Sequence, residues 1–330
     1  MSRIPLRTRL FAALLEHGPY PQIQQMDIAD IEAARSRVAP LTRPFTWVTG
    51  PLPPTVKISD AWAPMRDGSR RQLRTYRPDG AGPHPVVVFF HGGGWVLGSP
   101  RQYDPLCGQL AQRAQVLVVS VDYRMGPEHR APQAAHDAID ATSWIAEHAA
   151  SLRGDPSRLG VCGDSAGGNL AALVTHAAYD AGGPAIAHQA LIYPATDLSR
   201  SFPSIQEHAF APVLTKAKMD AFIDHYLGAH PRDLRDPALS PYWRADLSGL
   251  PPALVQTADN DPIRDEGLAY GARLAEAGVA VRRTNYLGAV HGFLSFPGAT
   301  HIGRQALSEL VTEVRRHLHP PVPAAAPELV

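Results

Sequence analysis

Short, almost uninterrupted apolar runs alternate with longer amphipathic stretches through the middle of the chain. The runs, such as "PVVVFF" and "VLVVSV", are too uniformly apolar to have a face in water, which is typical of strands buried on both sides of a sheet. The stretches between them space their apolar residues as helices do when they pack on a sheet. The pattern predicts a mostly parallel sheet covered by helices, an α/β fold.

The boundaries of these elements can be read from the same pattern. The expected strands are 85–90, 116–123, 158–165, 187–194, 252–259 and 279–287, and the expected helices are 131–152, 166–182, 265–278 and 301–318. Before them, residues 55–65 and 71–78 flank Asp67-Gly68, a turn signal that predicts an antiparallel hairpin. We expect the last strand to be a sheet edge, and because edges invite pairing, a homodimer through it is a hypothesis.

Two segments do not follow the alternation. Residues 1–45 precede the first strand and look helical, and residues 199–248 are a long insertion. Insertions near the carboxyl ends of parallel strands usually cover a site, since α/β proteins bind ligands at that edge. We therefore expect a single domain over 1–330 whose cap is formed by 1–45 and 199–248, with a flexible Pro/Ala-rich tail at 319–330.

Composition narrows the possible partners. Lys plus Arg and Asp plus Glu both number 31, and this balance argues against a nucleic-acid partner, which requires a net basic face. Only Cys107 and Cys162 are present, too few for a disulfide framework or a metal cluster. No secretory signal and no membrane-spanning run is apparent. We expect a cytoplasmic protein that acts on a small molecule without a metal or cofactor.

The stretch "GDSAGGN" lies between an apolar strand and a helical stretch. Gly163-x-Ser165-x-Gly167 matches the nucleophile elbow, in which a serine occupies a sharp, strained turn from strand to helix. Residues two positions before and after the serine crowd it unless they lack side chains. A glycine-rich turn with an incidental serine is the alternative, but its position between strand and helix favours a nucleophile at the positive end of a helix dipole.

A serine nucleophile needs a base that is itself oriented by a carboxylate. His291 and Asp261 each follow a strand's carboxyl end, at the edge where the elbow lies, and the order Ser165, Asp261, His291 is that of α/β-hydrolases. Asp261 is favoured as the acid because Pro262 fixes the turn behind it. The competing acids are Asp259, Asp265 and Glu266. The last two are expected to open the next helix.

Three consecutive glycines follow the strand 85–90 in "HGGGW". Acyl transfer creates an oxyanion that requires backbone N–H donors aimed at it, and glycines let a loop approach the substrate closely. We therefore expect an oxyanion hole formed by Gly92, Gly93 and Gly94, with a further donor from Ala166.

The motifs "HGGGW", "YRMGPEHRAP", "GDSAGGNLAA", "LIYPATD", "DNDPIRDEG" and "VHGF" occur in order between about residues 40 and 318. In these motifs the chain resembles the hormone-sensitive-lipase-type carboxylesterases, the bacterial family IV esterases. The resemblance implies an α/β-hydrolase fold, the catalytic triad named above, and oxyanion donors from Gly93 and Gly94 with Ala166. It also implies a cap built from the N-terminal segment and an insertion, and supporting roles for Tyr123 and Glu128.

The favoured hypothesis is a serine carboxylesterase that hydrolyses short- to medium-chain acyl esters through an acyl-enzyme. Apolar residues in the insertion are candidates for an acyl pocket, with ordinary cap packing as the alternative. They are Phe210, Val213, Leu214, Phe222, Tyr226 and Leu227. The same machinery suits an amidase, a lactonase or a deacetylase of a natural product. A non-catalytic ligand receptor is disfavoured because all three triad residues are present.

Overall fold

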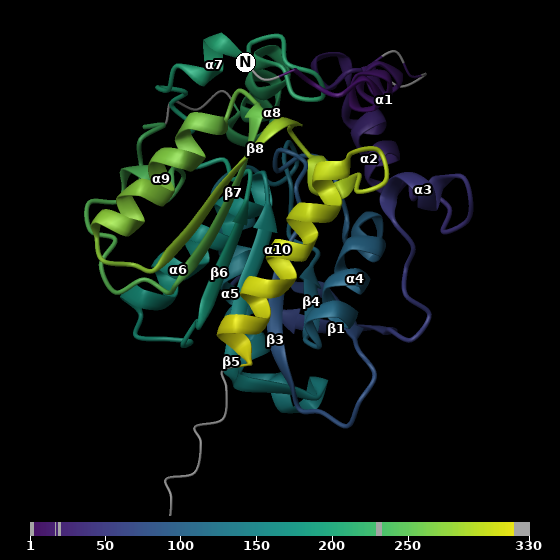
Figure 1. Ribbon diagram of the computed structural model, residues 1–330. Coiled ribbons are helices and arrows are strands. Elements are labelled where there is room, and N and C mark those ends of the chain that lie inside the picture. Colours follow the sequence, from purple (N-terminus) through teal and green to yellow (C-terminus); the bar gives the residue numbers. More distant parts are fainter. Residues whose placement is uncertain (1–2, 17, 19–20, 229–232, 320–330) are drawn as a thin grey trace, which may run out of the picture.

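The computed structural model describes residues 3–16, 18, 21–228 and 233–319 (Figure 1). Within them, eight strands form one sheet in the order β1-β2-β4-β3-β5-β6-β7-β8. β2 pairs antiparallel with both β1 and β4, and the other neighbouring strands are parallel. The predicted mostly parallel sheet with an antiparallel hairpin at its start is confirmed.

The strands are β1 (Lys57–Pro64), β2 (Arg70–Arg77), β3 (His84–Phe90), β4 (Leu117–Val121), β5 (Gly154–Asp164), β6 (His188–Ile192), β7 (Ala253–Asn260) and β8 (Val281–Val290). The helices are α1 (Leu6–Glu16), α2 (Ile28–Ser36), α3 (Phe45–Thr49), α4 (Asp104–Ala114), α5 (Gln133–His148), α6 (Ala166–Asp180), α7 (Ser204–Glu207), α8 (Lys216–Leu227), α9 (Arg264–Glu276) and α10 (His301–Leu318). Each predicted strand and helix is present. Helix α4 was not predicted.

The centre of the sheet is buried on both faces, as the apolar runs predicted. Every residue of β3 is buried, and its side chains alternate between two cores. Val86 and Val88 belong to the core that includes residues of α5 and α6, whereas Val87 and Phe89 belong to the core that includes residues of α4 and α10. With both faces covered, a ligand can reach the sheet only at the ends of its strands.

The helices outside the βα alternation gather at one such end. Figure 1 shows α1, α7 and α8 beyond the end of the sheet to which β7 and β8 point, with α2 and α3 beside it. None of the described helices is both long enough and apolar enough to cross a bilayer. Residues 320–330, nearly all of the expected tail, lie outside the described residues.

Strand β8 is the last in the sheet, so the predicted edge is confirmed. Arg282 on this strand pairs with Glu309 of α10 at 2.5 Å, which partly covers the edge with charge. Dimerisation through β8 stays a prediction, and a clean monomer mass in light scattering would contradict it.

Candidate active site

Ser165 joins β5 to α6 in a conformation that side chains rarely adopt. Its φ is 56° and its ψ is −118°. The two flanking glycines are required by contact: a Cβ on Gly163 would lie 2.1 Å from the carbonyl oxygen of Gly167, and a Cβ on Gly167 would lie 1.9 Å from that of Phe90. The expected elbow geometry is present, and it places the serine at the start of a helix, where the dipole favours negative charge.

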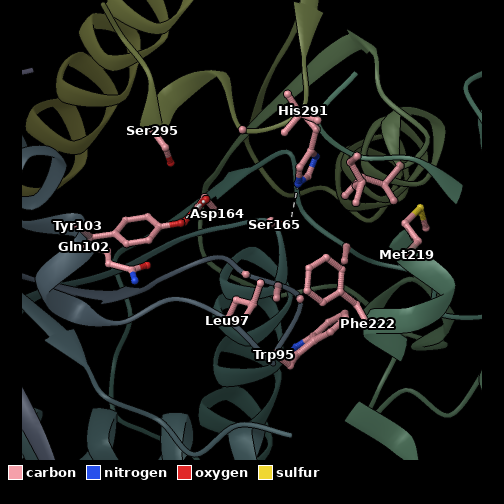
Figure 2. A pocket seen from close by; sticks show the side chains of 18 of the residues that line it. Trp95, Leu97, Gln102, Tyr103, Asp164, Ser165, Met219, Phe222, His291 and Ser295 are labelled. Atoms are coloured by element: carbon pink, nitrogen blue, oxygen red, sulfur yellow. Dashed lines mark hydrogen bonds between the residues drawn. The ribbon is translucent and has the colours of Figure 1, made fainter. Parts of the chain in front are cut away.

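The three residues expected to form a triad are in hydrogen-bonding contact, and Figure 2 shows the contact between Ser165 and His291. His291 Nε2 lies 2.9 Å from Ser165 Oγ, and His291 Nδ1 lies 2.7 Å from Asp261 Oδ2. Asp261 is fully buried, and its other oxygen accepts the N–H of Ile263 at 3.1 Å. The carboxylate is thus held from both sides and presents one oxygen to the imidazole.

Two of the competing acids have other partners. Asp265 accepts the N–H of Ser204 at 3.0 Å. Glu266 accepts the N–H groups of Thr196 and Asp197, at 2.7 and 3.2 Å, and burial raises its pKa well above the usual value. Both carboxylates lie in the first turn of α9, as expected. Asp261 is therefore the acid that meets the histidine.

The glycine run after β3 requires glycine at each position for a different reason. A Cβ on Gly92 would lie 2.6 Å from Asp164 Oδ2, and one on Gly93 would lie 2.1 Å from the backbone oxygen of Leu97. A Cβ on Gly94 would meet the Phe222 ring at 2.3 Å. Gly93 and Gly94 also have φ values of 121° and 62°, which favour glycine.

Gly92 was expected to donate its N–H group to the oxyanion, and the structure contradicts this expectation. Its N–H is already donated to Asp164 Oδ1 at 2.8 Å and lies 3.0 Å from the Tyr103 hydroxyl. A buried N–H with such a partner is satisfied within the protein and is not offered to a substrate. Gly92 anchors the loop, which leaves Gly93 and Gly94 to face the cavity.

Asp164 is a functional candidate that the sequence reasoning missed. Besides Gly92, it accepts hydrogen bonds from the hydroxyl groups of Tyr103 at 3.0 Å, which Figure 2 shows, and of Tyr193 at 3.3 Å. Burial raises its pKa to about 6. Its place directly before Ser165 in the chain was the one available signal.

The residues given supporting roles by the resemblance do contact the protein around the site. The Tyr123 hydroxyl donates to the backbone oxygen of His91 at 2.7 Å, and the two rings stack with their centroids 4.4 Å apart. Burial lowers the pKa of His91 to about 4, so the imidazole is neutral. Glu128 pairs with Arg35 of α2 at 2.7 Å and ties the N-terminal segment to the rest of the chain.

A mainly apolar cavity of about 430 Å³ opens over Ser165 and His291. Its side from the insertion consists of Val213, Leu214, Met219, Phe222 and Ile223. Figure 2 shows Phe222 and Met219 on this side, with Trp95 and Leu97 beside Phe222.

Three of the six residues expected to form an acyl pocket are therefore on the cavity wall, and three lie elsewhere. Phe210 is 95% exposed. Tyr226 is buried against Trp95, with ring centroids 4.7 Å apart, and Leu227 belongs to the core beneath.

Among the residues that the structure describes, one group has potential metal ligands close together. Ligand atoms of His188, Glu313 and His317 all lie within 4.8 Å of one another. The two imidazole rings, however, stack at 4.7 Å with planes 10° apart, so their in-plane lone pairs run parallel and do not converge on one ion. His188 begins β6, at the end of the sheet away from Ser165. This geometry gives no reason to connect the group with the chemistry at Ser165.

Comparison with known proteins agrees with this fold and site. A family model described as an alpha/beta hydrolase fold matches residues 87–295. The chain is similar to carboxylesterase NlhH of Mycobacterium tuberculosis, with 40% identity over 88% of this chain and 90% of that protein. It is also similar to an ethyl acetate hydrolase of Pseudomonas putida, with 37% identity over 79% and 83%.

Solved structures give the same result. An ester hydrolase from the metagenome of Lake Arreo, solved with a derivative of bipyridine phosphonate, superposes with a TM-score of 0.87 at 37% identity, over 96% of this chain and 99% of that one. The esterase of the hyperthermophilic archaeon Pyrobaculum calidifontis gives a TM-score of 0.85 at 36% identity, over 95% and 98%.

The chain belongs to the alpha/beta hydrolase family, in its hormone-sensitive-lipase-like branch. It is a carboxylic ester hydrolase, as its relatives are.

Proposed function

We propose that this hydrolase is a serine carboxylesterase that cleaves short- to medium-chain acyl esters through an acyl-enzyme on Ser165. The observation that carries the proposal is the continuous contact from Asp261 through His291 to Ser165, with Ser165 Oγ 2.9 Å from His291 Nε2 at the base of an apolar cavity. A neutral imidazole in this position is a general base for a hydroxyl that is otherwise a weak nucleophile.

In the first half of the reaction, Ser165 Oγ attacks the ester carbonyl carbon while its proton passes to His291 Nε2. The carbonyl oxygen becomes an oxyanion, for which Gly93, Gly94 and Ala166 supply N–H donors. The tetrahedral intermediate then collapses, the carbon–oxygen bond to the alcohol breaks, and His291 returns the proton to the departing alkoxide. Asp261 stabilises the imidazolium that exists between the two proton transfers.

In the second half, a water molecule takes the place of the alcohol. His291 removes one of its protons, the water oxygen attacks the acyl carbon, and a second oxyanion forms at the same donors. Collapse breaks the bond to Ser165 Oγ, which regains its proton from His291. Each oxyanion donor contributes on the order of 100- to 1000-fold in rate.

The cavity supports the proposed substrate class. Apolar side chains dominate its wall, and a volume of about 430 Å³ suits an acyl chain of modest length. One relative is named for hydrolysis of ethyl acetate, a short ester. The cap proposed to enclose this chain consists of residues 1–45 and 199–248, in one domain with the rest of the protein; Thr49, just after the first segment, and Phe222 in the second both line the cavity.

Hydrolysis of p-nitrophenyl esters from acetate to laurate by the wild type and by Ser165→Ala tests the proposal. We expect turnover of the shorter esters by the wild type and loss of about 10⁴-fold or more in kcat for the variant. Covalent labelling by a fluorophosphonate probe of the wild type, but not of Ser165→Ala, would identify Ser165 as the nucleophile. Turnover that survives in Ser165→Ala would contradict the mechanism.

An amide, a lactone or an acetylated natural product would use the same residues. Comparison of kcat/KM on matched ester and amide substrates separates these possibilities. A preference for the amide would overturn the proposed substrate class and leave the proposed triad standing.

A further inference from the structure

Large apolar side chains are exposed mainly in one region of the described chain, its first 47 residues. They are Leu6, Leu10, Leu14, Leu15, Ile28, Val38, Leu41, Phe45 and Trp47. Exposed apolar side chains scattered singly are ordinary, but a concentration of them on neighbouring elements marks an interaction surface. Figure 1 shows α1, α2 and α3 close together at one side of the molecule.

Helix α1 presents this apolar surface most clearly. Leu6, Leu10 and Leu14 are 68%, 64% and 70% exposed, and residues four apart share one face of a helix. The buried positions of the helix are Thr8 and Ala12, half a turn away from the leucines. The leucine row therefore points directly away from the protein.

Basic side chains border the row. At 3.6 residues per turn, Arg7 lies on one flank of the leucines and Arg9 on the other, and both are exposed. Arg3, just before the helix, is exposed as well. No acidic residue lies in the first turn, and Glu16 ends the helix. The protein as a whole has a formal charge of zero, so the positive charge is a local property of this helix.

The short helix α3 adds an aromatic component. Trp47 is 61% exposed, and the Arg43 guanidinium lies 5.6 Å from the centroid of its ring. Exposed Trp beside Arg is a pairing suited to the boundary between water and lipid, because the ring is amphipathic and the cation reaches the headgroups.

We propose that α1 is an interfacial helix that docks this protein on a lipid bilayer containing anionic phospholipids. The row Leu6, Leu10 and Leu14 enters the boundary of the acyl chains, and Arg7 and Arg9 bind headgroup phosphates on either side. A second copy of the chain fits the face less well, because a two-fold contact would bring the same arginines together.

Docking in this orientation would place the rim of the cavity near the lipid. Phe11 of α1 packs on Phe296, with ring centroids 4.9 Å apart, and Glu16 accepts the N–H of Val213 at 3.3 Å. Phe296 and Val213 both line the cavity. Helix α1 thus carries the docking face on one side and contacts the rim of the cavity with the other.

Co-sedimentation with vesicles tests the proposal without any reference to catalysis. The wild type is mixed with vesicles of phosphatidylcholine alone, or of phosphatidylcholine with an equal amount of phosphatidylglycerol. We expect sedimentation with the anionic vesicles and much less with the neutral ones, and weaker binding at high salt. Changing both Arg7 and Arg9 to Gln should weaken binding about thirtyfold, since each basic residue near an anionic surface contributes ~1 kcal/mol.

A triple variant with Leu6, Leu10 and Leu14 changed to Gln should lose sedimentation altogether. The matched control changes Trp62 and Arg70 to Gln; this exposed pair lies on the β1–β2 hairpin, away from the cap, with Arg70 6.0 Å from the Trp62 ring. The control should bind as the wild type does, and thermal melts should show that all variants fold.

Three results would overturn the proposal. The first is that the wild type stays in the supernatant with anionic vesicles, and the second is that it binds neutral and anionic vesicles equally. The third is that light scattering shows a dimer in the wild type and a monomer in the triple leucine variant, which would make the face an interface between two copies. None of these measurements depends on hydrolysis. A result that overturns the docking proposal therefore leaves the proposed esterase mechanism untouched.

Discussion

The two sides of the cavity over Ser165 and His291 are built from different parts of the chain. One side, the floor, consists of Gly93, Gly94 and residues 164–166, and the glycines in it and next to it leave no room for a Cβ. The other side, the wall, consists of Val213, Leu214, Met219, Phe222 and Ile223, whose apolar side chains face the cavity. Backbone cannot give way, whereas side chains can repack. We therefore expect the floor to determine whether a reaction occurs and the wall to determine which ester is used.

The largest effect should come from the base above the floor. His291→Ala removes the proposed proton acceptor for Ser165 and should lower kcat on p-nitrophenyl acetate by about 10⁴- to 10⁶-fold. Asp265→Asn is the matched control, because this acid is close in sequence to Asp261 but bonds Ser204. The control should stay within a few-fold of the wild type. A decrease in kcat of less than tenfold in His291→Ala would show that His291 is not the general base.

The next largest effect should come from Gly93 and Gly94, two adjacent positions that contact different parts of the cavity. Gly93→Ala and Gly94→Ala should each lower kcat/KM by about 100- to 1000-fold, because both displace proposed oxyanion donors. The clash at Gly93 is with a backbone oxygen, whereas the clash at Gly94 is with the Phe222 ring. Adding Phe222→Ala should therefore raise the kcat/KM of Gly94→Ala about tenfold and leave the kcat/KM of Gly93→Ala unchanged.

Equal rescue of both variants, or of neither, would contradict the distinction between a rigid floor and a wall that can repack. Phe222→Ala alone supplies the baseline for this double-mutant cycle. Kinetics should be measured on the acetate ester, which depends least on the wall.

A smaller decrease in kcat is expected from a change to Asp164, which holds the glycine loop through the N–H of Gly92. Asp164→Asn replaces a carboxylate that accepts from Gly92, Tyr103 and Tyr193 by a group that must donate at one side. The loop should lose its position, and kcat should fall about 10- to 100-fold with KM nearly unchanged. Unchanged kcat in Asp164→Asn would show that the Gly92 contact does not position the loop.

The same variant has a pH signature in stability. Because burial raises the pKa of Asp164 to about 6, the folded state keeps a proton between pH 4 and 6 that the unfolded state releases. In this window the Asp164 contribution lowers the free energy of unfolding as pH rises, by up to ~3 kcal/mol, and above pH 6 it is constant. The Asn side chain of Asp164→Asn cannot ionise, so the variant should lack this fall. In urea titrations, the free energy of unfolding of the variant relative to that of the wild type should therefore be higher at pH 7 than at pH 4.5.

The smallest effect should come from the wall. Leu214→Phe puts a larger side chain into the cavity and reduces its volume, which should lower kcat/KM for the longer p-nitrophenyl esters by roughly tenfold, with acetate nearly unchanged. A uniform loss over all chain lengths would mean that Leu214 supports the floor and does not select the acyl chain.

The sequence predicted the turn at Ser165 because that turn depends on local backbone. Gly163, Ser165 and Gly167 are close in the chain, and a strand before and a helix after them determine the turn. The partner of Gly92 could not be predicted in this way. Asp164 and Gly92 are 72 residues apart, and only the parallel pairing of β3 with β5 brings them together.

The wall and helix α4 were harder to predict for a similar reason. Phe210 and Phe222 are both apolar residues of the insertion, yet one faces solvent and the other faces the cavity, which only their tertiary contacts decide. Helix α4 contains Gly108, a poor helix former, whose lack of a side chain admits Leu52 to within 2.5 Å of where a Cβ would lie. That contact lies between distant parts of the chain and leaves no periodic signal.

The backbone conformation of Ser165 has a consequence for laboratory evolution of this enzyme. A non-glycine residue held at a φ of 56° and ψ of −118° costs about 1–3 kcal/mol, and glycine relieves that strain. Ser165→Gly should therefore melt at a higher temperature than the wild type while it loses the proposed nucleophile. A selection for heat resistance alone would favour inactive descendants at this position, so turnover must be screened in the same round as thermal survival.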